Sequence, residues 1–423
     1  MITFLISAIK IIFLLGFLIG IHETGHFLIA KLCKVRVNEF AIGFGPVIWK
    51  KQGKETKYEL RVIPIGGFVN MEGEEERSDK EGSFSKASIP KRISIVAAGA
   101  IVNIVFAVLV YFILSTTAIS NTSNVVAGIK DNFAAQSAGI QVGDKILKIN
   151  NKKIVTSTDI NNILNSDKEV SILIERDGKQ QTLNVKPTEN KYYSTGIYLQ
   201  SLESKSTEIV AIEPESASEK QGLQVGDTIV KINEQEVKGN PEKVLGILQN
   251  SEVNEQETIR YKFLVERTGK EIEIDIIPEQ KTNYYLGVEL AMPADTLANR
   301  LYYAAYDTKE FVFSIVSNIK QLFTGDVSTT QLVGPVGISE VVAKTNGFKE
   351  FIYILAVISI SLGVTNLLPF PPLDGGKIVL ILIEAIRKRP LKQETELKIQ
   401  MLGFAVLIGI SIMVTYNDIL RII

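Results

Sequence analysis

Two histidines and a glutamate are the residues of this sequence best suited to metal chemistry. The stretch His22-Glu23-Thr24-Gly25-His26 contains the only 2 histidines in 423 residues, and they stand four positions apart. On a helix this spacing projects both imidazoles from one face, where they can bind one Zn²⁺ at about 2.0–2.1 Å per nitrogen. Glu23 is placed to take a proton from zinc-bound water and pass it on. The motif therefore predicts a catalytic zinc centre with His22 and His26 as ligands and Glu23 as the base.

The element that must position this motif is an apolar helix. Residues 2–21 are apolar apart from Ser7, Lys10 and a few glycines, and residues 27–30 continue the run. About 20 apolar residues suffice to span a bilayer, and ionisable groups at that depth mark a functional site by default. We interpret the motif as a zinc site on a membrane helix rather than as two polar residues on an ordinary helix face. Lys10 is interpreted as a solvated or snorkelling side chain.

Composition excludes some classes of protein. The net charge of −1 gives no reason to expect a nucleic-acid partner. The single cysteine, Cys33, cannot form an internal disulfide, and we interpret it as a small buried residue. Because the N-terminal run has no basic segment before it and contains the motif, we expect it to be retained rather than cleaved as a signal peptide.

Three further apolar runs predict a multi-pass α-helical membrane protein with four transmembrane helices. They cover residues 95–119, 351–368 and 399–416. Basic residues cluster between the first and second spans and between the third and fourth. These residues are Lys31, Lys34, Arg36, Lys50, Lys51, Lys91 and Arg92, followed by Arg387, Lys388, Arg389, Lys392 and Lys398. The positive-inside rule then places both termini outside the cell and the histidine motif toward the cytoplasmic side of a bacterial membrane.

The chain between the first two spans predicts a membrane-associated β-hairpin region. Residues 37–71 alternate in character and contain the glycine-rich turns at residues 43–46 and 65–68. Strands beside the active site can offer an edge to an extended peptide, which makes Gly66 and Gly67 candidate substrate-binding residues. The alternative is a plain cytoplasmic hairpin without substrate contact. The acidic run at residues 72–76 is interpreted as a solvated turn.

An internal repeat fills the polar middle of the chain. Ser137-Ala138-Gly139-Ile140-Gln141-Val142-Gly143-Asp144 is matched by Lys220-Gln221-Gly222-Leu223-Gln224-Val225-Gly226-Asp227, and further matches follow in the same order. Two modules of about 85 residues account for the pattern, and both resemble PDZ domains, which accept a peptide chain end beside an exposed strand. We expect two extracytoplasmic PDZ-like α+β domains. The alternative is that they only shield or space the membrane core.

A second stretch with candidate functional residues lies at the end of the third predicted span. Residues 366–376 read Asn-Leu-Leu-Pro-Phe-Pro-Pro-Leu-Asp-Gly-Gly, and their prolines and glycines must break a helix. Broken backbone at membrane depth is tolerated where it lines a cavity, and the predicted orientation puts this break level with the histidines. Asp374 can then supply a third zinc ligand, which leaves one open position for water. Taken alone, Asp374 would be interpreted as a turn residue before Gly-Gly.

Together these features resemble the site-2 protease family of intramembrane zinc metalloproteases, in the bacterial branch of regulator of sigma-E proteases with two PDZ domains. Residues 43–46, 99–103 and 334–338 also match that branch, although Gly99-Ala100 stands where the family often has Gly-Pro. The resemblance implies a four-span core, zinc on the cytoplasmic side, and cleavage within the bilayer of single-span proteins already trimmed outside, such as an anti-sigma factor. It further implies that Asn366 helps to open or hold the substrate helix.

The predicted division of the chain follows from these boundaries. Residues 1–120 and 351–423 form the membrane core, 121–203 and 204–292 the PDZ-like domains, and 293–350 a linker of amphipathic helices. Three other functions remain open at this point. They are a peptidase that clears remnant signal peptides, a non-catalytic scaffold with a structural zinc, and a metal transporter.

Overall fold

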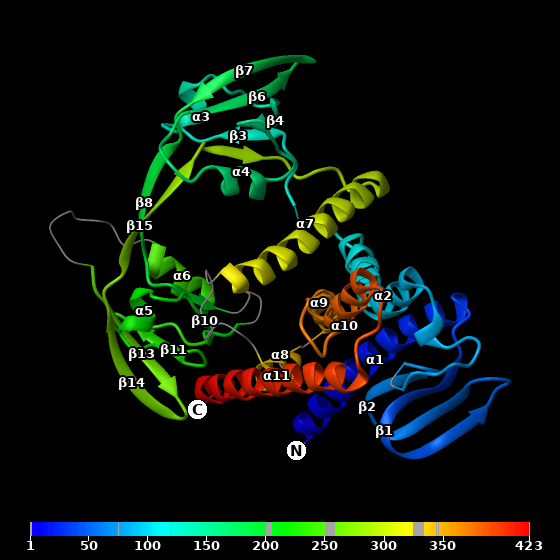
Figure 1. Ribbon diagram of the computed structural model, residues 1–423. Helices are drawn as coiled ribbons and strands as arrows, with labels where there is room; N and C mark the ends of the chain where they lie inside the picture. The colour runs from blue at the N-terminus through cyan, green and yellow to red at the C-terminus, as the bar shows by residue number, and fades with distance from the viewer. Residues whose placement is uncertain are drawn as a thin grey trace. The chain divides into compact units, whose positions relative to one another are not determined.

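The structure is a computed structural model, and it describes residues 2–74, 76–119, 121–199, 205–249, 259–324, 334–343, 345 and 347–422 (Figure 1). The chain divides into two compact units. The membrane unit consists of the residues up to 119 together with residues 295–421, and the repeat unit consists of the residues between them. All four predicted spans lie in the membrane unit.

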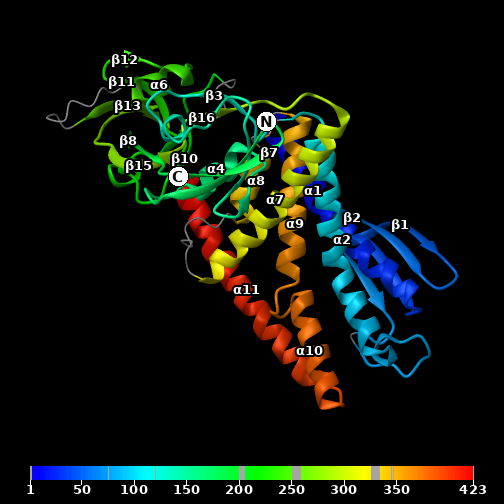
Figure 2. The ribbon, with the colours of Figure 1, turned by 90° about the horizontal axis from the view of Figure 1, so that it is seen from above.

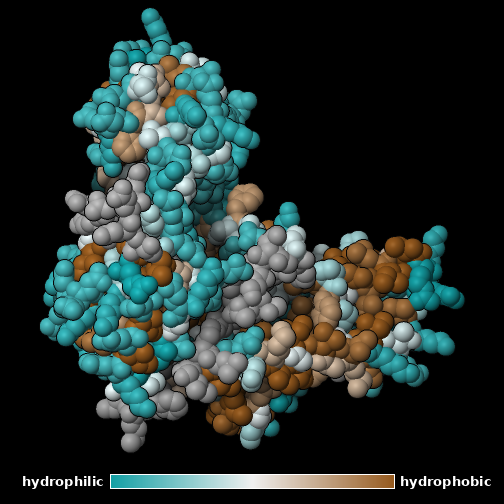
Figure 3. Space-filling model, turned by 90° about the vertical axis from the view of Figure 1, so that its left-hand side faces the viewer, coloured by the Kyte–Doolittle hydropathy of each residue, from teal (hydrophilic) through white to brown (hydrophobic). Residues whose placement is uncertain are grey.

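Four helices are long and apolar enough to cross a membrane: Ala8–Leu32, Ile89–Ser115, Phe348–Asn366 and Gln393–Ile419. The second begins six residues earlier than predicted, because Ser88 stands at its N-cap and a proline occupies its first turn. Apolar side chains on the fourth are exposed, among them Met401, Leu402 and Phe404. Figure 3 shows apolar surface gathered on the membrane unit, as expected for helices that face lipid.

The membrane unit contains seven α-helices and one 3₁₀ turn within its described residues. They are α1 (Ile2–Leu32), the 3₁₀ turn Phe84–Lys86, α2 (Ile89–Ser115), α7 (Leu297–Thr324), α8 (Pro335–Ala343), α9 (Phe348–Asn366), α10 (Asp374–Arg387) and α11 (Gln393–Ile422). Helix α2 packs against α1, α7, α9 and α10. A Cβ added to Gly25 would lie 2.6 Å from the carbonyl oxygen of Ala98, so α1 and α2 meet backbone to backbone.

The predicted hairpin consists of β1 (Val37–Gln52) and β2 (Lys57–Met71). The strands bend so that Phe40 lies opposite Val69 on one side and opposite Tyr58 on the other. Within the described residues, each member of the segment 67–71 has a single partner, which leaves this segment at an edge of the sheet. The rings of Phe27 and Phe40, with centroids 5.1 Å apart, fix the sheet against α1.

Two glutamates of the acidic run after β2 are less exposed to solvent than the sequence indicated. Glu72 and Glu74 have side chains only 12% and 19% exposed, and each is paired with a lysine. The interpretation of residues 72–76 as a solvated turn is therefore wrong for these two residues. Glu75 lies outside the described residues.

The predicted break after the third span is present, and a helix that was not predicted follows it. Helix α9 ends at Asn366 and α10 begins at Asp374, so an irregular loop connects them (Figure 2). A Cβ on Gly376 would lie 2.5 Å from the backbone nitrogen of Pro371, so α10 starts directly against the loop. Helix α10 was not predicted from the sequence because its apolar residues form too short a run to span a membrane.

The linker between the repeat unit and the third span is helical, as predicted, and α7 and α8 form it. Residues 331–333, which lead into α8, lie outside the described residues. The interpretation of Lys10 as solvated or snorkelling is wrong. Its Nζ donates to the carbonyl oxygen of Thr345 at 2.8 Å and to the Thr345 hydroxyl at 3.2 Å, just beyond the end of α8.

The repeat unit contains two similar sets of elements. The first set is β3 (Val126–Ile129), α3 (Ala134–Ser137), β4 (Lys145–Ile149), β5 (Lys152–Lys153), α4 (Ser157–Ile163), β6 (Val170–Arg176), β7 (Lys179–Val185), β8 (Thr188–Ser194) and β9 (Ile197–Leu199). The second is β10 (Ile209–Ile212), α5 (Ala217–Lys220), β11 (Thr228–Ile232), β12 (Gln235–Glu236), α6 (Pro241–Gln249), β13 (Tyr261–Arg267), β14 (Lys270–Ile276), β15 (Glu279–Tyr285) and β16 (Val288–Leu290). Their four-stranded sheets have the orders β5-β4-β6-β7 and β12-β11-β13-β14, so the sequence repeat is also a structural one.

The two repeats exchange their last strands. β16, from the second repeat, pairs with β3 of the first, and β9, from the first, pairs with β10 of the second. The ladder of β8 and β15 joins them (Figure 1). The predicted division into 121–203 and 204–292 therefore describes the sequence repeat but not two self-contained domains. The residues at that division, 203 and 204, lie outside the described residues.

Candidate metal centre

The two motif histidines converge as the helical spacing predicts. Their Nε2 atoms lie 3.1 Å apart, and both side chains are nearly buried where α1 packs on α2. Two imidazole nitrogens this close cannot both carry a proton at the point where they meet. The arrangement suits a cation between them better than it suits two free rings.

Asp374 completes a triangle of donor atoms. Its Oδ2 lies 3.2 Å from Nε2 of His22 and 3.6 Å from Nε2 of His26. Two ligands at about 2.05 Å on a tetrahedral zinc ion are separated by about 3.3 Å, a value that these distances bracket. Asp374 Oδ2 is buried without a hydrogen-bond donor among the described residues. A buried carboxylate oxygen of this kind requires a cation, so the residues fit Zn²⁺.

Helix α2 orients both histidine rings. Nδ1 of His26 donates to the carbonyl oxygen of Ile95 at 2.8 Å, which leaves its Nε2 free to bind a metal. The Asn103 amide lies 3.4 Å from Nδ1 of His22 and is completely buried. Sequence reasoning missed both orienting contacts, and the only signal was that Asn103 interrupts an apolar run.

Gly99 leaves room for the centre. A Cβ at this position would overlap Nε2 of His26 and lie 2.8 Å from Nε2 of His22. The departure from the family pattern falls on the next residue, Ala100, which is buried and close to Gly363 of α9.

The sheet brings an open edge beside Glu23. A Cβ on Gly67 would lie 3.3 Å from Cγ of Glu23 and 2.8 Å from the carbonyl oxygen of Ala41. The backbone N–H of Val69, in the same edge segment, donates to the Glu23 carboxylate. The residue predicted to act as the base therefore lies between the histidines and the edge of the sheet.

The three predicted substrate-binding residues differ in their placement. Gly67 lies against Glu23, whereas Gly66 has φ +100° and lies against the ring of Phe44, which a Cβ would overlap. Asn366 is the last residue of α9, and its side chain makes no hydrogen bond among the described residues. The structure thus leaves the Asn366 amide available at the break that precedes Asp374.

A His-His-Asp centre on apolar helices, with an acidic residue next to the first histidine, is the type of site that a membrane zinc peptidase has. Comparison with known proteins agrees with this class. The model of Peptidase family M50 matches residues 10–410. The chain therefore belongs to Peptidase family M50, the site-2 protease family.

Individual relatives match over nearly their whole length. The chain is 28% identical to the regulator of sigma-E protease RseP of Escherichia coli, with 100% of both chains covered. It is 29% identical to the regulator of sigma E protease of Haemophilus influenzae, with 99% of this chain and 100% of the relative covered. A Vibrio cholerae protein whose name designates it a candidate zinc metalloprotease is 29% identical over 98% of each chain.

These findings make the chain a zinc metalloprotease of a bacterial membrane, with Zn²⁺ as its cofactor. The scaffold and transporter interpretations are set aside.

Proposed function

We propose that this protein is an intramembrane endopeptidase that hydrolyses peptide bonds within the transmembrane segment of single-span membrane proteins. The observation that supports the proposal is the triangle of His22, His26 and Asp374 on membrane helices, with Glu23 between it and an open sheet edge. A site built this way works on an extended peptide at membrane depth.

Each residue has a distinct role in the proposed reaction. His22, His26 and Asp374 hold Zn²⁺, which when bound supplies a Lewis acid for water and for the substrate carbonyl. Glu23 accepts the proton of the attacking water and returns it to the leaving amine. Asn103 and the Ile95 carbonyl hold the two rings in the tautomer that binds metal.

The substrate must unwind before it can react. In lipid each backbone group freed from a helix costs several kcal/mol, so partners for those groups have to be provided. The edge segment 67–71 supplies backbone donors and acceptors by β-strand addition. The Asn366 side chain adds a further polar contact at the helix break.

The repeat unit is proposed to act outside the membrane, with both termini also outside and the metal centre toward the cytoplasm. A groove of about 430 Å³ lies in the repeat unit between α4 of the first repeat and β16 of the second. It is lined by Ile160 and Leu164 near α4 and by Leu286, Val288 and Leu290 at β16. Polar side chains such as Lys130 and Asn161 line it as well, and this mixed lining beside a strand suits a peptide chain end. The unit would admit substrates shortened by an earlier cut, such as an anti-sigma factor. Remnant signal peptides are short-tailed substrates of the same kind.

The test measures zinc and cleavage together. Wild type and Glu23→Gln are purified in detergent and their metal is quantified. Each is then incubated with a single-span substrate that has a short outer tail and with the same substrate carrying a bulky outer domain. We expect about one zinc per chain in both proteins, cleavage of the short-tailed substrate by wild type, and none by Glu23→Gln.

Two results would contradict the proposal. Cleavage by Glu23→Gln at the wild-type rate would remove Glu23 from the mechanism. Equal cleavage of the two substrates by wild type would leave the protease in place and reject the selection of short-tailed substrates.

A further inference from the structure

The helix that carries Asp374 has no side-chain cap at its start. Asp374 is the first residue of α10, and Leu373, at the N-cap, offers no side-chain hydrogen bond. The orphan N–H groups of a helix start are usually satisfied by such a cap, which also fixes where the helix begins. Gly375 and Gly376 are buried against the preceding loop, but they carry no side chain that could hold the helix in place. Other contacts must determine where Asp374 lies.

Lys377, one turn after Asp374, forms an ion pair with the loop after β2. Its Nζ lies 2.6 Å from Oε1 of Glu74, and the two side chains are only 23% and 19% exposed. A cation in the first turn of a helix is disfavoured by the helix dipole. The Glu74 carboxylate offsets that cost and fixes the first turn of α10 to the loop after β2.

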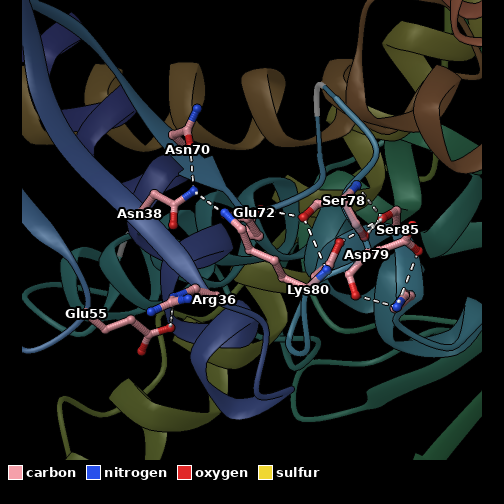
Figure 4. Close-up of polar contacts among 11 residues, drawn as sticks. Arg36, Asn38, Glu55, Asn70, Glu72, Ser78, Asp79, Lys80 and Ser85 are labelled. Atoms are coloured by element: carbon pink, nitrogen blue, oxygen red, sulfur yellow. Dashed lines mark hydrogen bonds and ion pairs between the residues drawn. The ribbon is translucent and has the colours of Figure 1, made fainter.

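The loop after β2 is itself attached to the sheet. The Glu72 carboxylate accepts from Asn38 at 3.2 Å and from Ser78 at 2.5 Å, and Lys80 lies 3.2 Å away (Figure 4). The backbone N–H of Glu72 donates to the carbonyl oxygen of Arg36 at 2.9 Å. Glu74, two residues further on, is thus carried by a segment fastened to β1.

A second ion pair holds α10 further along. Nη1 of Arg92, from α2, lies 3.1 Å from Oε1 of Glu384, and Nη2 donates to Oε2 at 3.1 Å. Both Arg92 and Lys377 lie over the ring of Phe84, at 5.3 Å and 5.4 Å from its centroid. Phe84 is buried, and its N–H donates to the carbonyl oxygen of Glu72 at 2.7 Å. The loop, α2 and α10 therefore meet around one ring.

We propose that Glu74 and Lys377 are positioning residues of the metal centre, which set the first turn of α10 so that Asp374 reaches the two histidines. The Arg92–Glu384 pair holds the rest of the helix against α2. This inference rests on the proposed ligand set. It adds that the loop at residues 72–86, whose described residues include none of the proposed ligands, determines how tightly the metal is held.

The test measures apparent zinc affinity of the full-length protein in detergent, by competition with a chromogenic chelator. The variants are Lys377→Met, Glu74→Gln and the reversed pair Glu74→Lys with Lys377→Glu. Lys398→Met is the matched control, because Lys398 pairs with Glu394 on α11 with side chains 72% and 77% exposed. Glu74→Gln changes a loop residue and tests the same pair without altering the helix. A thermal unfolding curve for each variant shows that it is folded.

We expect each single variant to bind zinc about tenfold more weakly, the low end of the range for residues that support metal ligands. The reversed pair should recover to within about threefold of wild type, and Lys398→Met should bind as wild type does. Wild-type affinity in both single variants would overturn the inference, as would a reversed pair no better than the single variants. His22→Ala distinguishes a failure of the proposed ligand set from a failure of the positioning role alone. If this variant binds zinc as wild type does, the proposed ligand set fails, and the inference fails with it.

Discussion

The Asn103 amide on α2 lies 3.4 Å from Nδ1 of His22 on α1, across 81 positions of sequence. When a metal is bound at Nε2, Nδ1 of His22 carries the proton and must donate it. The atom of Asn103 that lies there is Nδ2, and Oδ1 has no hydrogen-bond partner among the described residues, so exchanging the two ends of the amide supplies the acceptor. The second span therefore helps to orient the ring of a proposed ligand on the first.

Replacing Asn103 with leucine should weaken zinc binding by about tenfold or more, because His22 then loses the acceptor that fixes its tautomer. Asn103→Asp keeps an oxygen and should bind more tightly than the leucine variant. Ser359→Ala is the control, since the Ser359 hydroxyl donates to the backbone oxygen of Asn103 and not to its amide. Chelator competition measures all three, and equal affinities would refute the role of the amide.

Adding one methyl group at Gly99 should abolish zinc binding. The new Cβ would overlap Nε2 of His26, one of the proposed ligand atoms. The matched control is Gly20→Ala on α1, where a Cβ meets nothing within 4 Å. Metal content measured on both purified variants tests the prediction, and a zinc-loaded Gly99→Ala protein would contradict it.

The equivalent arginines of the two repeats should be important for the stability of the repeat unit. Arg176 binds Asp144, and Arg267 binds Asp227 at 2.6 Å; both aspartates are almost completely buried. Arg176→Leu removes the cation that pairs with the buried Asp144 carboxylate and leaves it only the backbone N–H of Gln141 among the described residues, so we expect a larger loss of stability than from an exposed pair. Arg260→Leu, from the exposed Arg260–Asp275 pair, should cost about 0.5 kcal/mol or less. Chemical unfolding followed by the fluorescence of tyrosines in this unit compares the two, and equal losses would contradict the expectation.

Three residues could be proposed as metal ligands from sequence because their chemistry is concentrated in short motifs. His22 and His26 are one helical turn apart, and Asp374 occurs where prolines and glycines must break a helix. The spans followed from apolar runs close to or above the length that crosses a bilayer, about 20 residues. Such signals are local, and each depends on residues close together in the chain.

The features that sequence reasoning missed depend on partners far apart in the chain. Lys10 was interpreted as solvated or snorkelling, yet its Nζ donates hydrogen bonds to Thr345, 335 positions further along the chain. The strand exchange was missed because a repeat of about 85 residues looks the same whether each copy closes on itself or on its neighbour. The Glu74–Lys377 pair spans 303 positions, so no spacing rule could reveal it.

Acidification should release the loop that carries Glu74. Hydrogen bonds from Ser78 and Asn38, with Lys80 alongside, lower the pKa of Glu72 from 4.5 to about 2. A carboxyl group whose pKa is lower in the folded state stabilises that state above its unfolded pKa. The contribution of Glu72 is therefore complete above about pH 4.5 and is lost as the pH falls toward 2.

The Glu72→Gln variant has no carboxylate charge at position 72 for the neighbouring donors to stabilise. Its free energy of unfolding should therefore lie below that of wild type at neutral pH. The difference should shrink below pH 4.5 and vanish near pH 2. Hydrogen exchange of the backbone amides of residues 78–86, followed over this range, measures the effect where it arises. Glu81→Gln, an exposed carboxylate in the same loop, should follow wild type at every pH. If the difference between wild type and Glu72→Gln stayed constant from pH 7 to 2, the Glu72 carboxylate would not be what holds the loop.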